Sequence, residues 1–236
     1  MPSEFKMTPP IFAALDMDNN LEALNLAKNI RPYVGGFKIG PRLSVKYGAN
    51  FIKELKEYGL VFLDNKYYDI PNTMLSSVKQ AFEMGVDFVT IHGTCGPVAL
   101  KALAELEAKF NEQRAFRILV VTILTSFNDD NLPANYKDTS IEDQVLEIAK
   151  QSYECGLKSF VCSPLEVSKM REAFPDAYLV TPGIRMGDVE GDDQQRVLTP
   201  PEAIKSGASA LVIGRPIYKA QHPQAAAEEI FKSLSE

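Results

Sequence analysis

The chain has 236 residues, 45% of them hydrophobic and 24% charged, which is typical of a globular protein with one large domain or two small ones. Its formal net charge of −6 argues against general nucleic-acid binding, which requires a basic face, but leaves room for a small anionic ligand held by a few local donors. The three cysteines form no C-x-x-C pair, the N-terminus lacks a signal-peptide run, and no stretch approaches the roughly 20 apolar residues of a membrane span. We therefore expect a soluble, cytoplasmic protein that binds neither nucleic acid nor a membrane.

Eight short apolar runs, rich in β-branched and aromatic residues, predict eight strands. Their nearly continuous apolarity, without the alternation of a half-exposed strand, is typical of a parallel sheet buried on both faces. The runs span 11–16, 35–40, 60–66, 88–93, 117–125, 159–164, 177–183 and 210–216.

The segments between these runs have the periodicity of amphipathic helices. The predicted helices span 20–33, 44–58, 72–85, 96–110, 140–156, 164–174, 200–207 and 223–235. A strand followed by a helix, eight times over, predicts an α/β fold of the (β/α)8 TIM-barrel type, with a single domain over 1–236. The alternative is a doubly wound open sheet, although such sheets more often have five or six strands.

Charged residues stand where the first three predicted strands end: Asp16, Lys38, and Asp64 with Lys66. In a barrel the carboxyl ends of all strands meet on one face, where active sites lie. Asp64 and Lys66 are two positions apart on a strand, so both side chains should point to the same side. An active site and a purely structural network of ion pairs would both produce this charge pattern.

Three further features extend the pattern. Asp69 precedes Ile-Pro-Asn-Thr and is either a helix cap or part of the same charged group. Gly214 and Arg215 end the eighth predicted strand, where barrels often bind phosphate through backbone N–H groups and a bidentate arginine. The polar segment 184–200 follows the seventh strand and predicts a lid over a ligand.

Together these segments resemble the orotidine 5′-monophosphate decarboxylase family over nearly the whole chain. The most specific match is D-x-K-x-x-D-I-P-N-T at 64–73. The other matches follow in order: LD at 15–16, FKIG at 37–40, VTxLTS at 121–126, TPGIR at 181–185, DQxRxxTP at 193–200 and VIGRPI at 212–217.

The resemblance implies a barrel homodimer whose two active sites lie at the dimer interface. The implied reaction converts orotidine 5′-monophosphate into uridine 5′-monophosphate and carbon dioxide, the last step of de novo UMP synthesis. No metal and no organic cofactor is implied, which agrees with a sequence that contains two histidines and no evident ligand cluster.

The resemblance also implies catalytic roles for four residues. Lys66 would donate the proton to C6 of the pyrimidine, and Asp64 would oppose the charge of the substrate carboxylate. Lys38 would orient Asp64, and Asp69 would reach the site from the neighbouring subunit. The implied substrate-binding residues are Asp16, Lys38, Thr73, Thr125, Pro182, Arg185, Gln194, Gly214 and Arg215.

Two departures from the family pattern fall inside the signature. Asn65 stands where the family usually has an apolar residue; by alternation it should point toward the helices and need a hydrogen-bond partner there. Tyr67 and Tyr68 replace a Phe-His or similar pair, which bears on local packing and the dimer contact. We interpret His92, at the mouth of the barrel, as structural.

Two other functions are compatible with parts of the sequence. A magnesium-dependent sugar-phosphate decarboxylase or hexulose-phosphate synthase shares the D-x-K-x-x-D core, although the I-P-N-T continuation and the DQxRxxTP segment argue against it. A catalytically silent nucleotide-binding barrel is the second alternative, and the intact Asp64 and Lys66 pair argues against that one.

Overall fold

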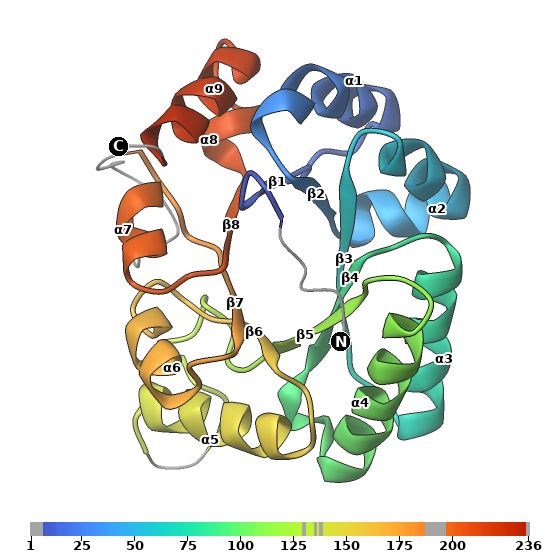
Figure 1. Ribbon diagram of the computed structural model, residues 1–236, viewed down its shortest axis with the longest axis vertical. Helices are drawn as coiled ribbons and strands as arrows, with labels where there is room; N and C mark the ends of the chain where they lie inside the picture. The colour runs from blue at the N-terminus through green and yellow to red at the C-terminus, as the bar shows by residue number, and fades with distance from the viewer. Residues whose placement is uncertain (1–6, 129–130, 135, 137–138, 187–196, 235–236) are drawn as a thin grey trace.

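Within the residues that the structure describes, 7–128, 131–134, 136, 139–186 and 197–234, the computed structural model is a closed barrel of eight parallel strands (Figure 1). The strands are β1 (Ile11–Ala14), β2 (Gly36–Ile39), β3 (Leu60–Tyr67), β4 (Phe88–His92), β5 (Arg117–Val121), β6 (Ser159–Val161), β7 (Tyr178–Thr181) and β8 (Ala210–Ile213). Each strand pairs with its neighbours in the sequence, and β1 pairs with β8 to close the ring. The predicted (β/α)8 TIM barrel is confirmed.

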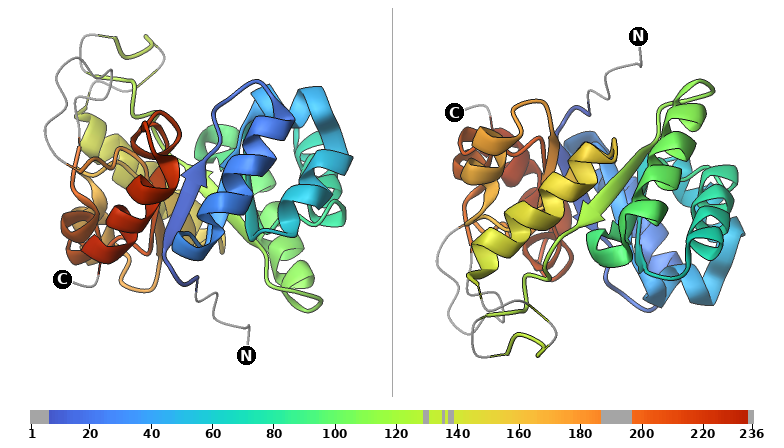
Figure 2. Two further views of the ribbon diagram at one scale, coloured as in Figure 1. Left: turned by 90° about the horizontal axis from the view of Figure 1, so that it is seen from above. Right: turned by 90° about the horizontal axis from the view of Figure 1, so that it is seen from below.

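Helices surround the barrel wall, as the side views of Figure 2 make clear. They are α1 (Asn20–Ile30), α2 (Pro41–Lys56), α3 (Pro71–Glu83), α4 (Pro97–Asn111), α5 (Ile141–Glu154), α6 (Val167–Ala173), α7 (Pro200–Lys205), α8 (Arg215–Tyr218) and α9 (Pro223–Ser233). The first and last long helices, α1 and α9, lie side by side, and the hydroxyl of Tyr33 donates to Glu228 across this junction at 3.2 Å.

Several predicted boundaries are wrong, and three of these have a clear physical reason. The fifth strand ends at Val121 rather than at 125, because the neighbouring β6 is short and offers no further backbone partners. The eighth ends at Ile213 rather than at 216, because Pro216 has no N–H for the sheet and instead suits the first turn of α8. Helix α2 begins at Pro41 rather than at 44 for the same reason.

The inside of the barrel is apolar at its amino-terminal end. Phe12, Phe62 and Phe88 are buried there, and the ring centroids of Phe12 lie 5.3 and 5.0 Å from those of Phe62 and Phe88 in edge-to-face contacts. A side chain at Gly36 would meet Phe12 at 2.9 Å and the Leu60 carbonyl at 2.6 Å, so glycine is required beside this cluster. The aromatic cluster closes the bottom of the barrel, and any ligand must enter from the carboxyl-terminal end.

A buried carboxylate ties the amino-terminal ends of β3 and β4 to the helices. Asp87 is 4% exposed and accepts hydrogen bonds from the Val61 N–H at 2.8 Å and from Lys56. Arg114 lies 3.4 Å from the same carboxylate, and its guanidinium covers the Phe82 ring at 4.0 Å. This cluster faces away from the ligand-accessible end and therefore serves the fold.

The three cysteines, Cys95, Cys155 and Cys162, are free thiols. None of the helices in the described part of the chain has both the length and the apolarity needed to cross a bilayer.

Replacing Asp87 with alanine should lower the free energy of unfolding by about 2 kcal/mol, because the Val61 N–H and two cations would lose their buried acceptor. Urea unfolding followed by circular dichroism measures the change. Asp176→Ala, which breaks an exposed pair with Lys158, is the matched control and should cost less than about 0.5 kcal/mol. Equal losses in the two variants would contradict this account of Asp87.

Candidate active site

A pocket opens at the carboxyl-terminal ends of the strands and collects most of the residues predicted from the sequence. The predicted residues that line it are Asp16, Lys38, Asp64, Lys66, Thr125, Pro182, Arg185, Gly214 and Arg215. Their side chains converge because alternate residues of each strand face inward: Phe62 closes the floor on β3, and Asp64 and Lys66 follow on the same strand. The barrel thus brings distant sequence positions together, as predicted.

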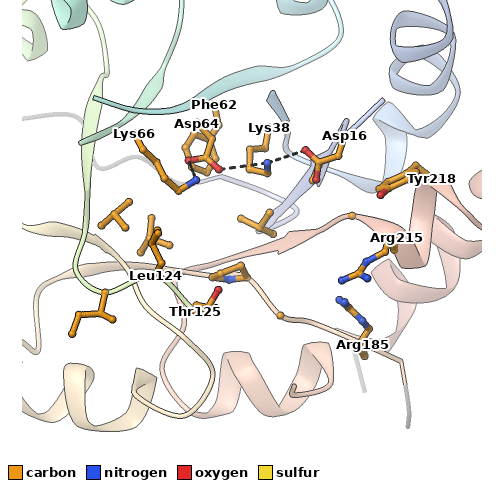
Figure 3. Close-up of a pocket in the computed structure, with 18 residues that line it drawn as sticks. Asp16, Lys38, Phe62, Asp64, Lys66, Leu124, Thr125, Arg185, Arg215 and Tyr218 are labelled. Carbon is orange, nitrogen blue, oxygen red and sulfur yellow. Dashed lines mark hydrogen bonds and ion pairs between the residues drawn. The ribbon is translucent and has the colours of Figure 1, made fainter. Parts of the chain in front are cut away.

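Four charged side chains form a row of alternating sign along one side of the pocket (Figure 3). The Lys66 ammonium lies 2.8 Å from Oδ1 of Asp64, and the Lys38 ammonium lies 3.5 Å from Oδ2 of the same carboxylate. Lys38 also donates to Asp16 at 3.2 Å. The two central side chains, Lys38 and Asp64, are 12% and 15% exposed, so the row is partly withdrawn from water.

Asp64 is held as a carboxylate by its neighbours. Burial on its own raises the pKa of this group, but the ammonium groups of Lys38 and Lys66 and the hydroxyl of Thr90 together lower it below the ordinary value of 3.8. The pKa of His92, on the next strand, is lowered by burial and by the Lys66 charge, so this imidazole is neutral at pH 7. The positive charge near Asp64 therefore comes from the lysines.

The backbone at Lys66 is irregular, which the sequence did not reveal. Leu63 pairs with Val89 and Tyr67 pairs with Ile91, so three residues of β3 stand opposite one residue of β4. Lys66 has a φ of 50°, a left-handed conformation that costs a side-chain-bearing residue roughly 1–3 kcal/mol and is concentrated at functional sites. This bulge places the Lys66 ammonium beside Asp64.

Thr90 is the residue that faces this bulge, and the sequence analysis missed it. Its hydroxyl donates to Oδ1 of Asp64 at 3.0 Å and accepts from the Lys66 N–H at 2.9 Å. One signal was available in the sequence: Thr90 has the same strand parity as the inward-facing Phe88, which places a polar side chain inside the barrel.

The opposite part of the pocket is cationic. Figure 3 shows the guanidinium groups of Arg185 and Arg215 pointing toward one another from separate segments. Arg185 is only 6% exposed and donates to the Ile184 carbonyl at 2.8 Å, which fixes its direction. Two guanidinium groups that converge in a pocket suit a doubly charged anion such as a phosphate monoester.

Apolar side chains also line the pocket. Val121, Ile123 and Val161 line the pocket together with the exposed Thr125 and the ring of Pro182. Tyr218, from the short helix α8 that the sequence analysis did not predict, closes the side next to Asp16. The arrangement suits a flat ring with an anionic tail.

Three predicted residues do not join the pocket. Asp69 and Thr73 are exposed, and Asp69 accepts a hydrogen bond from the Ile70 N–H at 2.7 Å. Neither lines the pocket of its own chain. Gln194 lies outside the described residues, as does much of the predicted lid at 184–200.

The two departures from the family pattern have local explanations. Asn65 points away from the pocket, and its side-chain oxygen accepts from the Ser44 hydroxyl at 3.0 Å, so the partner that the sequence analysis required is present. Tyr67 is half-buried against the core, whereas Tyr68 is exposed and contacts the His92 ring edge-on with centroids 5.8 Å apart. Neither substitution disturbs the charged row.

Among the residues described, no three His, Cys, Asp or Glu side chains are grouped so that they could hold a metal ion.

Comparison with known proteins gives a consistent result. The family described as "Orotidine 5′-phosphate decarboxylase / HUMPS family" matches residues 9–230. The chain is 42% identical over 227 residues to the orotidine 5′-phosphate decarboxylase of Trichlorobacter lovleyi, covering 95% of this chain and 94% of that protein. It is 39% identical over 228 residues to that of Vibrio cholerae, covering 96% and 98%. The crystal structure of orotidine 5′-phosphate decarboxylase from Lactobacillus acidophilus superposes with a TM-score of 0.83 at 34% identity, covering 96% of this chain and 99% of that one.

Replacing Lys38 with methionine should raise the pKa of Asp64, because burial would then be opposed by one fewer ammonium. A carbon-detected NMR titration of the Asp64 carboxyl measures the shift, with Lys53→Met as the control at an exposed position. The low pKa of Asp64 in the wild type has a second consequence. Above pH 3.8 the ionised carboxylate stabilises the fold, and this contribution disappears as the pH falls through the pKa of the folded state. An unchanged titration in Lys38→Met would contradict the role given to this ion pair.

Proposed function

Since the chain belongs to the orotidine 5′-phosphate decarboxylase / HUMPS family, we propose that it is a carboxy-lyase that converts orotidine 5′-monophosphate into uridine 5′-monophosphate and carbon dioxide in UMP biosynthesis. The observation that carries the proposal is the row Lys66–Asp64–Lys38–Asp16 in one pocket with the converging Arg185 and Arg215. Relatives named orotidine 5′-phosphate decarboxylase at about 40% identity over nearly the full chain support the choice of substrate.

Lys66 is the proton donor in this proposal. When the bond between C6 and the carboxylate breaks, the electron pair stays on C6, where the pyrimidine ring delocalises it poorly. An ammonium that is already fixed by its 2.8 Å contact with Asp64 stabilises this charge without reorganising during the reaction. The proton then passes from Lys66 to C6, and the neutral amine takes a proton from water, to which its partly exposed side chain has access.

Asp64 opposes the substrate carboxylate. Its lowered pKa keeps it ionised at neutral pH, so a second carboxylate placed beside it is repelled until carbon dioxide leaves. Carbon dioxide is uncharged, whereas the carboxylate from which it forms is charged. The apolar side chains of Val121, Ile123 and Val161 therefore favour the departing carbon dioxide over the carboxylate. Stabilisation of the C6 carbanion by Lys66 is the larger effect in this mechanism.

The phosphate of the substrate is assigned to Arg215, Arg185 and the backbone N–H of Gly214. Charge-assisted hydrogen bonds to this group, remote from C6, supply binding energy that orients the ring against Lys66. Asp16 and Lys38 are assigned to the ribose hydroxyls and Thr125 to the pyrimidine edge, next to Pro182. The assignment of Gln194 to phosphate and base remains a prediction.

We further propose a homodimer that shares its two sites. Asp69 and Thr73 are exposed in the single chain, and Asp69 stands between Tyr68 and Ile70, which are 62% and 67% exposed. Large apolar side chains at this level of exposure on either side of an acid suit a contact with another protein surface. In the dimer Asp69 and Thr73 would enter the partner's pocket and continue the charged row. The cytoplasmic location also remains a prediction.

The reaction itself is tested by incubating the protein with orotidine 5′-monophosphate in the presence of a chelator and following the ultraviolet change to uridine 5′-monophosphate. Turnover should be unaffected by the chelator, because every role above is filled by a group of the protein chain. Loss of activity that magnesium restores would contradict the metal-independent mechanism. No turnover under either condition would refute the proposed function.

The shared site is tested with two inactive variants. Lys66→Ala and Asp69→Asn should each lower kcat by at least about 10³-fold and leave binding of uridine 5′-monophosphate largely intact. Unfolding and refolding a 1:1 mixture should restore about a quarter of wild-type activity, because half of the dimers are hybrid and each hybrid has one complete site. A mixture as inactive as its components would contradict the sharing of sites, and full activity of Lys66→Ala would contradict the assignment of Lys66 as the proton donor.

A further inference from the structure

Thr90 lies beside the charged row, at the point where the pairing of β3 with β4 is interrupted. It lies within β4, is fully buried, and faces the three residues of β3 that have a single counterpart on β4. The residues before and after it, Val89 and Ile91, pair regularly with β3, so the disruption of the ladder is confined to this point.

The hydroxyl of Thr90 uses both of its hydrogen-bonding capacities there. As an acceptor it binds the Lys66 N–H at 2.9 Å, and as a donor it binds Oδ1 of Asp64 at 3.0 Å. The Lys66 ammonium binds the same Oδ1 at 2.8 Å. One hydroxyl therefore links the main chain of Lys66 to the carboxylate that holds the Lys66 side chain.

The Thr90 hydroxyl replaces a backbone hydrogen-bond partner that the bulge takes away from β3. A bulge leaves backbone groups of the longer strand without partners on the other strand, and a left-handed φ at a lysine persists only when its surroundings enforce it. The Thr90 hydroxyl supplies an acceptor to the N–H of the residue in that conformation. Because threonine is branched at Cβ, its side chain has few rotamers and holds this acceptor in one place.

We propose that Thr90 is a positioning residue for the decarboxylation: through its hydroxyl it fixes the bulge at Lys66 and the orientation of the Asp64 carboxylate, and so directs the Lys66 ammonium at the reacting carbon. Thr90 is not among the residues that line the pocket, so the inference gives it no direct contact with the substrate. The inference rests on the proposed function for its kinetic consequence, whereas its structural part concerns Lys66 and Asp64 alone.

Two replacements of Thr90 separate the hydroxyl from the volume of the side chain. Thr90→Val keeps the shape and removes both hydrogen bonds, and it should lower kcat for orotidine 5′-monophosphate by about 10- to 100-fold while changing KM less than about threefold. Thr90→Ser keeps the hydroxyl and should stay within about fivefold of wild type. Thr122→Val is the matched control, since the buried Thr122 hydroxyl has no hydrogen-bond partner within the described part of the chain, and its kcat should be unchanged.

A second readout distinguishes positioning from loss of folded protein. The groups that act on the pKa of Asp64 are Lys38, Lys66 and Thr90, and the Asp64 charge in turn acts on the pKa of the nearby His92. Removing the Thr90 donor should move the Asp64 carboxyl titration, and with it the acidic limb of kcat, to higher pH. Rates are expressed per binding site for uridine 5′-monophosphate, so that unfolded protein does not lower them. If Thr90→Val does not fold, Thr90→Ala carries the same expectations.

The results distinguish a failure of this inference from a failure of the proposed function. A kcat of Thr90→Val within threefold of wild type, or equal losses in Thr90→Val and Thr90→Ser, would overturn the inference. If the wild type itself does not turn over orotidine 5′-monophosphate, the proposed function fails instead. In that case the NMR titration of Asp64 decides the structural part of the inference: a shift to higher pH in Thr90→Val supports it, and an unchanged titration refutes it.

Discussion

The contact on which the site depends is that of one carboxylate with two ammonium groups. Each oxygen of Asp64 faces a different lysine, Lys66 at 2.8 Å and Lys38 at 3.5 Å. Withdrawing these charges from water is costly, and the cost is offset only while acid and base alternate. The charges are therefore interdependent: the side chain that would protonate the substrate is oriented by the carboxylate that would repel it, and that carboxylate stays ionised because the lysines are there.

The barrel supplies the conditions for this arrangement by dividing its interior into two parts. Aromatic rings, Phe12, Phe62 and Phe88, fill the amino-terminal end, and the charges stand above them at the carboxyl-terminal end. Closely packed rings exclude water from below, and in a less polar environment a fixed ammonium acts more strongly on a developing negative charge. The fold contributes to the chemistry through this floor as well as through the residues at the rim.

How far the site could be predicted differs from residue to residue. A parallel barrel places the carboxyl ends of all its strands on one face, so recognising the strands was enough to predict Asp16, Lys38, Asp64 and Lys66 as site residues. Thr90 could not be predicted in this way, because its role depends on a bulge in the pairing of β3 with β4, and pairing register is not encoded in either strand alone. The short helix α8 was missed for a local reason: its four residues follow closely on the apolar run of β8 and are too few to show a helical period, and only Pro216 signals the change.

The sequence by itself determined the order of strands and helices, the side of each strand that its residues face, and the segments that carry the family resemblance, because periodicity and motif spacing are properties of neighbouring residues. The tertiary structure decided which side chains meet: that Asp64 lies between two lysines, that Thr90 holds the bulge, and that Asp69 stays outside the pocket of its own chain. These contacts join residues from different strands, and their distances follow from the closure, twist and register of the whole barrel.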